Sequence, residues 1–247
     1  MPLLILSVIV QIALVVHVMR TGRAVYWIYL IVFVPMIGSI AYLIVELLPE
    51  LSGNPQARGA LRSIRKKLDP EADIRQHQRM HKLSGSVDAA RHLAGELTAS
   101  GRYEEAIRHY EAALTGLYEH DPDLMLGLAQ ARFGNGDFAK ARETLDVLIE
   151  KNPDFRSAEG HLLYARSVEQ CGDLHKAEEE YRAVAAYYPG AEAKVRFAQL
   201  LERQGKPAEA LAEYEDIVTS AELAPRHYRK AQKTWIAEAS SGAKRLS

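Results

Sequence analysis

The strongest constraint on the fold is a sequence pattern that recurs about every 34 residues in the second half of the chain. Four segments begin with a glycine and reach an alanine five residues later, the glycines being Gly101, Gly136, Gly172 and Gly205. A second alanine stands twelve residues before each of those alanines, at Ala94, Ala129, Ala165 and Ala198. This period is the size of one helix-turn-helix unit, which buries its apolar face only by stacking on its neighbours. The pattern therefore predicts an all-α array of about four helical hairpins.

The paired alanines resemble those of the tetratricopeptide repeat. In that family, a small residue of the first helix and an alanine of the second meet where the two helices cross most closely. Large side chains also stand at the family's packing positions, namely Leu93, Leu128, Tyr164 and Phe197 in the first helices and Tyr110, Leu145, Tyr181 and Tyr214 in the second. The resemblance implies an α-solenoid over residues 87–222, with repeats at about 87–120, 122–155, 158–190 and 191–222.

Residues 223–247 predict a terminal element for this array. Tyr228, Ala231 and Trp235 follow Pro225 at helical spacing and alternate with basic residues. A repeat array needs an end piece with one apolar and one polar face. We expect a C-terminal capping helix here, with a frayed tail from Gly242, and a partner-binding helix is the alternative.

The N-terminal segment has a different composition. Residues 2–19 contain only Ser7, Gln11 and His17 as polar side chains, and residues 24–48 carry no charge before Glu46. Each run is about as long as a bilayer core is thick. We therefore expect an N-terminal two-helix transmembrane hairpin over residues 1–49. A signal peptide or a buried soluble hairpin is the alternative, but the first needs a cleavage site and the second a polar face.

Part of this segment resembles a known membrane hairpin. Trp27, the run from Pro35 to Gly38, and Tyr42-Leu43 are similar to the N-terminus of phospholipase-D-type cardiolipin synthases. An unrelated span with a proline kink is the alternative. That family acts through two His-x-Lys-x4-Asp motifs, and none of the nine histidines here has a lysine two positions later. The resemblance therefore implies a related anchor without the catalytic sites.

Basic residues follow the second apolar run within the linker 50–86. Positive charge remains on the cytoplasmic side of a membrane, and the loop between the two runs carries only Arg20 and Arg23. We expect a two-span protein of the bacterial inner membrane with its repeats on the cytoplasmic side. The candidate membrane-surface residues are Arg58, Arg62, Arg65, Lys66 and Lys67. A solvated linker helix is the alternative to lipid contact.

Several classes of function are disfavoured. Residues 85–247 hold 21 Lys and Arg against 27 Asp and Glu, a net charge of −6, which argues against nucleic acid as a partner. Cys171 is the only cysteine, so intrachain disulfides and multi-cysteine metal sites are excluded. His77 and His81 have the spacing of two metal ligands but lack an evident third, so we expect exposed helix residues. We predict no catalytic residue, no cofactor and no metal, and hence no enzyme.

The family resemblance also implies a concave groove lined by fixed positions of each first helix. The predicted partner-binding residues are Arg91, Leu126, Gln130, Phe133, Leu162, Arg166, Glu169, Gln199, Glu202 and Arg203. Their mixture of apolar and charged side chains suits an extended or helical peptide. We expect a membrane-anchored adaptor or scaffold for a protein or peptide partner. The alternatives are a non-catalytic accessory subunit of envelope phospholipid metabolism and a factor in envelope assembly.

Overall fold

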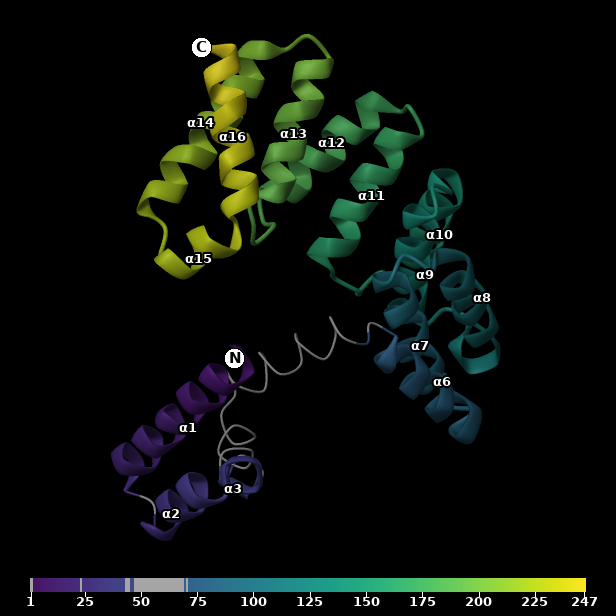
Figure 1. Ribbon diagram of the computed structural model, residues 1–247. Helices are drawn as coiled ribbons and strands as arrows, with labels where there is room; N and C mark the ends of the chain where they lie inside the picture. The colour runs from purple at the N-terminus through teal and green to yellow at the C-terminus, as the bar shows by residue number, and fades with distance from the viewer. Residues whose placement is uncertain (1, 23, 43–44, 47–68, 70) are drawn as a thin grey trace. The chain divides into compact units, whose positions relative to one another are not determined.

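The computed structural model describes residues 2–22, 24–42, 45–46, 69 and 71–247 (Figure 1). Every regular element in these ranges is a helix. The chain divides into two compact units, Met1–Ala72 and Asp73–Ser247. Each unit has its own apolar core.

The N-terminal unit contains α1 (Pro2–Thr21), α2 (Tyr26–Phe33) and α3 (Pro35–Tyr42). Its core contains Leu14, Val18, Trp27, Ile31 and Tyr42. Polar contacts support the same packing. The Nδ1 of His17 lies 2.9 Å from the Tyr42 hydroxyl, and the Nε1 of Trp27 donates to Glu46 Oε1 at 3.2 Å. The helices of this unit are therefore joined by aromatic packing and by hydrogen bonds of the aromatic side chains.

The second apolar run is not one continuous helix. It is interrupted at Val34, so that α2 and α3 each contain eight residues. A proline has no N–H to continue the helical ladder, and the break falls directly before Pro35. A Cβ at Gly38 would lie 2.1 Å from the Leu30 carbonyl oxygen, so only glycine fits this close approach.

The predicted pair of transmembrane helices is not supported. Among the helices of the described residues, none combines the length and the apolarity that a membrane span requires. In the second run, the physical reason is the interruption at Val34. The predicted membrane-surface residues lie outside the described residues, namely Arg58, Arg62, Arg65, Lys66 and Lys67.

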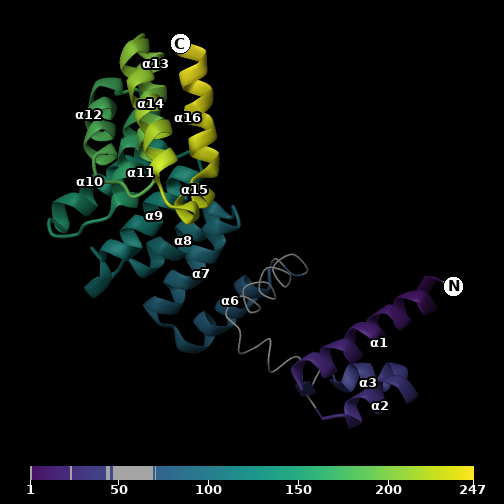
Figure 2. The same cartoon turned by 90° about the vertical axis from the view of Figure 1, so that its left-hand side faces the viewer.

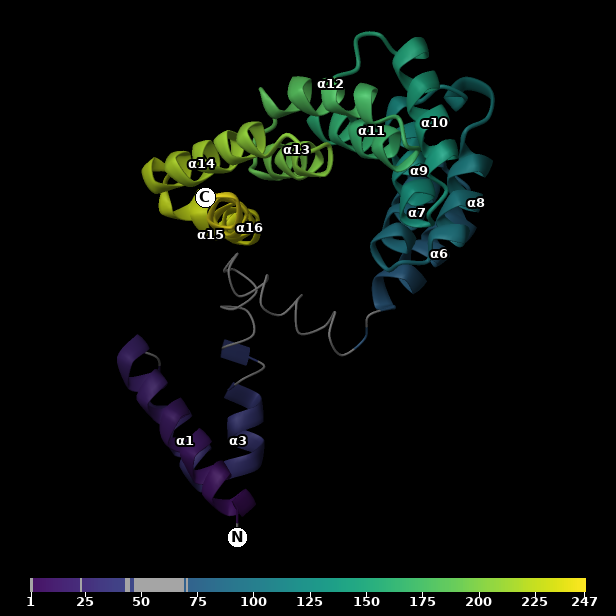
Figure 3. The same ribbon diagram turned by 90° about the horizontal axis from the view of Figure 1, so that it is seen from above.

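The larger unit begins with α6 (Ala72–Ser84) and continues as four helical hairpins. The hairpins are α7 (Val87–Ala99) with α8 (Tyr103–Ala113), α9 (Pro122–Gly134) with α10 (Phe138–Lys151), α11 (Ala158–Gln170) with α12 (Leu174–Ala185), and α13 (Glu192–Arg203) with α14 (Pro207–Leu223). A short 3₁₀ turn, η2 (Gly116–Tyr118), joins the first two. Figure 3 shows the hairpins following one another around a bend, with α11 and α13 on its inner side.

The repeated glycines end the first helix of each hairpin. All four have positive φ, between 74° and 87°, a conformation that L side chains rarely adopt. The residue after Gly101, Arg102, donates its N–H to the Leu97 carbonyl at 2.9 Å, and Lys206 donates to Leu201 in the same way at 2.9 Å. This satisfies carbonyls that the helix end leaves free. The glycines therefore set the tight turn between paired helices.

The paired alanines belong to the buried core of the array. All eight are fully buried, namely Ala94, Ala106, Ala129, Ala141, Ala165, Ala177, Ala198 and Ala210. The large residues of the pattern are buried around them, with Tyr181 and Tyr214 among the largest fully buried side chains. Small residues allow close helix approach, and the large ones fill the space between successive hairpins. The predicted helical-hairpin array is confirmed.

The C-terminal residues form two helices rather than the one predicted. They are α15 (Arg226–Ala231) and α16 (Lys233–Leu246), separated at Gln232. The Gln232 side chain accepts a hydrogen bond from the Ala191 backbone N–H at 3.2 Å, which holds the break against the fourth hairpin. The expected frayed tail is also wrong, because α16 continues to Leu246 and Gly242 is buried within it. Figure 2 shows α16 running beside α14.

Candidate partner-binding cleft

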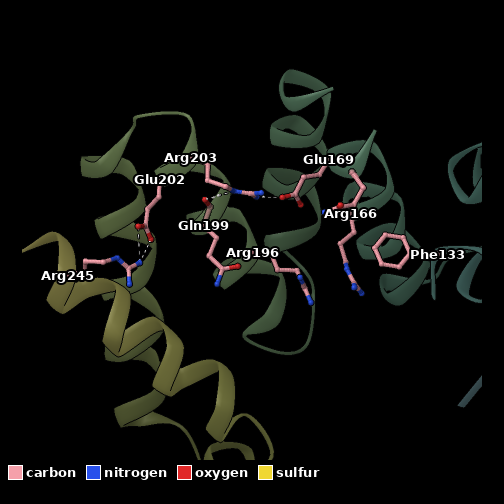
Figure 4. A pocket seen from close by; sticks show the side chains of 9 residues that line it. Phe133, Arg166, Glu169, Arg196, Gln199, Glu202, Arg203 and Arg245 are labelled. Atoms are coloured by element: carbon pink, nitrogen blue, oxygen red, sulfur yellow. Dashed lines mark hydrogen bonds and ion pairs between the residues drawn. The ribbon is translucent and has the colours of Figure 1, made fainter. Parts of the chain in front are cut away.

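A cleft of about 450 Å³ opens between the first helices of the last three hairpins and α16. Figure 4 shows its side chains projecting from α9, α11, α13 and α16. The lining residues are Phe133, Arg166, Glu169, Gln170, Arg196, Gln199, Glu202, Arg203 and Arg245. The last three hairpins each contribute their first helix to this cleft. A glycine ends each of these helices at a similar position, so the hairpins repeat the same geometry. We call this site the cleft.

Two arginines of the cleft lie against aromatic rings. The Cζ of Arg166 is 4.4 Å from the centre of the Phe133 ring, and the Cζ of Arg196 is 5.1 Å from that of Trp235. A guanidinium over an aromatic face is stabilised by the ring quadrupole and is held in one orientation. Phe133 and Trp235 thus fix the positions of the two charges.

Two carboxylates of the cleft are already engaged. Glu169 accepts hydrogen bonds from the Tyr181 hydroxyl at 2.5 Å and from the Arg203 guanidinium. Glu202 repeats this arrangement, with the Tyr214 hydroxyl at 2.6 Å and Arg245 at 2.7 Å. In each case the tyrosine comes from the second helix of the same hairpin, and the arginine comes from a later helix, α13 for Arg203 and α16 for Arg245. These contacts tie successive elements together across the cleft.

The electrostatics follow from these contacts. Burial raises the pKa of Tyr214, and its hydrogen bond to Glu202 raises it further. Burial opposes ionisation of Glu202, but the hydrogen bonds from Tyr214 and Arg245 outweigh it and lower the pKa of that carboxyl. Burial lowers the pKa of Arg166, and the nearby charge of Arg196 lowers it further. Among the described residues, each of the other three arginines of the cleft forms an ion pair, and Arg166 does not.

Six of the ten residues predicted for the groove line this cleft, and four do not. The six are Phe133, Arg166, Glu169, Gln199, Glu202 and Arg203. Arg91 lies on α7 and forms ion pairs with Asp88 at 2.7 Å and Asp123 at 3.4 Å. Leu126 packs on the core, and Gln130 is exposed on α9 outside the cleft.

Leu162 is a correction to the predicted groove. Its side chain is only 2% exposed, because its face of α11 turns into the core, as Val195 does on α13. It is a packing residue and is not accessible to a partner.

Sequence reasoning missed Arg196, Arg245 and Gln170. Arg196 stands on a first helix, but at a position that the family pattern does not place in the groove. Arg245 comes from the cap, 43 residues beyond Glu202. The one available signal for Arg245 was the basic character of the C-terminal residues, which carries no information about the contact made.

The histidines of α6 are not the exposed helix residues that the sequence suggested. His77 and His81 of α6 are half-buried, with ring centres 5.9 Å from His92 and 5.6 Å from His109. Among the described residues, no three His, Cys, Asp or Glu side chains are grouped to hold a metal ion. Cys171 is exposed at the end of α11.

Comparisons with known proteins agree with this architecture. Two models of the tetratricopeptide repeat family match residues 97–167 and 162–236. These matches give no support to the resemblance between the N-terminal residues and cardiolipin synthases. No curated protein matches the chain in sequence.

Solved structures with the same fold include TTC0263, a thermophilic TPR protein of Thermus thermophilus. It is 21% identical, with a TM-score of 0.53, over 68% of this chain and 88% of that one. MamA is 17% identical, with a TM-score of 0.51, over 73% of this chain and 92% of its own. At these identities the likeness concerns the fold alone. The stacked helical hairpins of this chain are tetratricopeptide repeats.

Proposed function

We propose that this chain is an adaptor that binds a segment of a protein partner in the cleft. Tetratricopeptide repeats generally mediate protein–protein interactions through surfaces formed by the stacked helices. The observation that carries the proposal is the convergence of Phe133, Arg166 and Gln199 from three different hairpins on one cleft. Aromatic and arginine side chains are the residue types that dominate the energetics of protein interfaces.

A pull-down with the full chain tests this function. The double variant Phe133→Ala with Arg166→Glu removes the aromatic contact and reverses the adjacent charge. It should abolish recovery of partners that the unmodified chain retains from solubilised membranes. The matched control is Leu117→Ala with Arg108→Glu, because both residues are exposed and lie outside the cleft. Equal recovery by both variants and the unmodified chain would contradict the proposal.

We propose further that the N-terminal unit holds the repeats at a membrane, on the cytoplasmic side of a bacterial inner membrane. Large apolar side chains are exposed on α1 and α2, among them Ile12, Met19 and Phe33, the last with 77% of its surface exposed. Apolar surface of this extent favours an apolar environment. The basic residues of the linker would then face anionic headgroups, namely Arg58, Arg62, Arg65, Lys66 and Lys67.

Fractionation and protease access test this placement. The full chain should remain in the membrane pellet after carbonate extraction, and a variant lacking residues 1–48 should be released. In intact spheroplasts the repeats should resist added protease, and they should be digested once the cells are lysed. Digestion in intact spheroplasts would place the repeats outside and favour a role in envelope assembly.

Exchanging residues 1–48 for an unrelated membrane anchor separates the adaptor from an accessory subunit of phospholipid metabolism. An adaptor that works through the cleft should keep its partner after the exchange. Loss of the partner with an intact cleft would assign recognition to the N-terminal residues.

A further inference from the structure

The cleft is lined by more positive than negative side chains, and the arginines differ in how they are paired with carboxylates. Four arginines and two glutamates line it. The surrounding repeats are acidic, with a net charge of −6 over residues 85–247 (21 basic against 27 acidic residues). The cleft is therefore a local concentration of positive charge on an acidic block. A concentration of one sign in a concave surface attracts a ligand of the opposite sign.

Both carboxylates of the cleft are occupied by the protein itself. Glu169 binds Tyr181 and Arg203, and Glu202 binds Tyr214 and Arg245. The corresponding arginines, Arg203 and Arg245, are neutralised in the same contacts. Arg203 and Arg245 are thus paired with the two carboxylates that line the cleft, and the other two arginines of the cleft are not.

The remaining two are Arg166 and Arg196. Among the described residues, no carboxylate lies within ion-pair distance of Arg166, and its resolved contact is the Phe133 ring. Arg196 donates its Nε to Glu192 at 2.8 Å, which leaves its two terminal nitrogens for a further acceptor. Figure 4 shows both side chains pointing to the same side of the cleft, away from the pair of Glu169 and Arg203.

This arrangement is unfavourable without a ligand. A partly buried guanidinium loses hydration, and a second guanidinium nearby repels it. Both effects act on Arg166, whose pKa is lowered first by burial and then by Arg196. An anionic group bound between the two would offset the lost hydration and the mutual repulsion, and it would form charge-assisted hydrogen bonds with planar donors.

We infer that Arg166 and Arg196 bind the side-chain carboxylate of an aspartate or glutamate within the partner segment, with Phe133 as the adjacent apolar contact. The inference rests on the proposed function, since it names the chemistry that the cleft recognises. An acidic side chain within a chain fits better than a terminal carboxylate, because the cleft is larger than one side chain and is lined along α11, α13 and α16.

The test uses the full-length chain in detergent micelles and an array of random 12-residue peptides with amidated C-termini. The bound peptides should be enriched in Asp and Glu over the composition of the array. The tightest of them, labelled for fluorescence anisotropy, should bind Arg166→Gln or Arg196→Gln about tenfold more weakly. Replacing its acidic residues by Gln or Asn should have a similar effect. Arg108→Gln removes the same charge outside the cleft and should leave binding unchanged.

The outcomes separate this inference from the proposed function. Bound peptides without acidic enrichment that still require Phe133 would overturn the carboxylate assignment and leave the cleft as the binding site. Binding that is indifferent to Phe133→Ala, Arg166→Gln and Arg196→Gln, or an array with no bound peptide, would overturn both. In a second array with free C-termini, binding confined to those peptides would assign the site to chain ends and overturn the side-chain assignment.

Discussion

The Tyr214 ring lies directly against Gly242, so closely that a Cβ at residue 242 would come within 2.4 Å of a ring carbon. The same relationship occurs in the first half of the array, where a Cβ at Gly127 would come within 2.5 Å of the Tyr110 ring. In both cases a tyrosine of a second helix packs on a glycine of a later helix, α9 for Tyr110 and α16 for Tyr214. The helix α16 thus packs on the fourth hairpin through the same tyrosine–glycine contact by which α9 packs on the first.

Replacing Gly242 by alanine should destabilise the C-terminal end of the array. In an exposed helix, Gly to Ala stabilises by about 0.5–1 kcal/mol. At residue 242 the added methyl group meets the Tyr214 ring, and forced overpacking costs roughly 1–3 kcal/mol. Urea unfolding should therefore show a net loss of stability. Gly95→Ala is the control, since the nearest atom to its Cβ would be 3.8 Å away, and that variant should gain stability. A gain at both residues would contradict the packing described.

The turn glycines should not tolerate a Cβ. Gly172 has φ of 86°, which costs an L residue about 1–2 kcal/mol, although no atom outside the turn lies within 4 Å of its Cβ position. Gly172→Ala should lower the melting temperature, and Gly172→Asn should lower it less, because asparagine adopts this conformation more readily. Equal effects of the two variants would indicate a cause other than backbone conformation.

The Tyr214 hydroxyl should contribute to the stability of the cap through Glu202. A hydrogen bond to a charged group contributes about 1.5–3 kcal/mol, and Arg245 remains as a second donor in the variant Tyr214→Phe. We expect Tyr214→Phe and Arg245→Met each to lower the free energy of unfolding. In a double-mutant cycle the two changes should not be additive, because both groups donate to one carboxylate. Strict additivity would indicate that they act independently.

Mild acid should loosen α6 from the first hairpin. Burial lowers the pKa of His109, and the neighbouring charges of His81 and Arg108 lower it further. Glu105 raises this pKa, but its effect is smaller. A histidine with a lowered folded pKa binds protons preferentially in the unfolded state. Its neutral form therefore favours folding above its ordinary pKa, and this contribution is lost as the pH falls through the ordinary value.

Thermal unfolding at about pH 7.5 and about pH 5.5 measures this effect. The unmodified chain should melt at a lower temperature in the more acidic buffer, and His109→Asn should reduce the difference. His175→Asn is the control, because that side chain is 88% exposed on α12. An equal pH dependence in the unmodified chain and in His109→Asn would exclude His109 as its origin.

The helical hairpins could be predicted because the pattern that forms them is local. Ala94 and Ala106 stand twelve residues apart on the two helices of one hairpin and are buried in the same apolar cluster, so the spacing in the sequence already indicates a shared core. Glu202 and Tyr214 are also twelve apart and are joined by a hydrogen bond. The family pattern assigns Leu162 to the groove by its position along the helix alone, whereas this face of α11 packs into the core.

The cap and the N-terminal unit depended on contacts that no local spacing encodes. The separation of α15 from α16 at Gln232 coincides with a hydrogen bond to Ala191, 41 residues earlier in the chain. Arg245 enters the cleft only because α16 packs on α13 and α14. In the N-terminal unit, Pro35 indicated a kink, but composition alone did not show that the run would divide into two helices of eight residues.

The contact of Tyr214 with Gly242 bears on how such a chain can change in length over evolution. The contact between the last hairpin and α16 is of the same kind as the contact between the first hairpin and α9. After the gain or loss of one complete hairpin, α16 would therefore still pack on a second helix that carries an equivalent tyrosine. A deletion of half a hairpin would instead leave α16 facing the wrong partner. Growth by whole modules is therefore compatible with an unaltered C-terminal sequence.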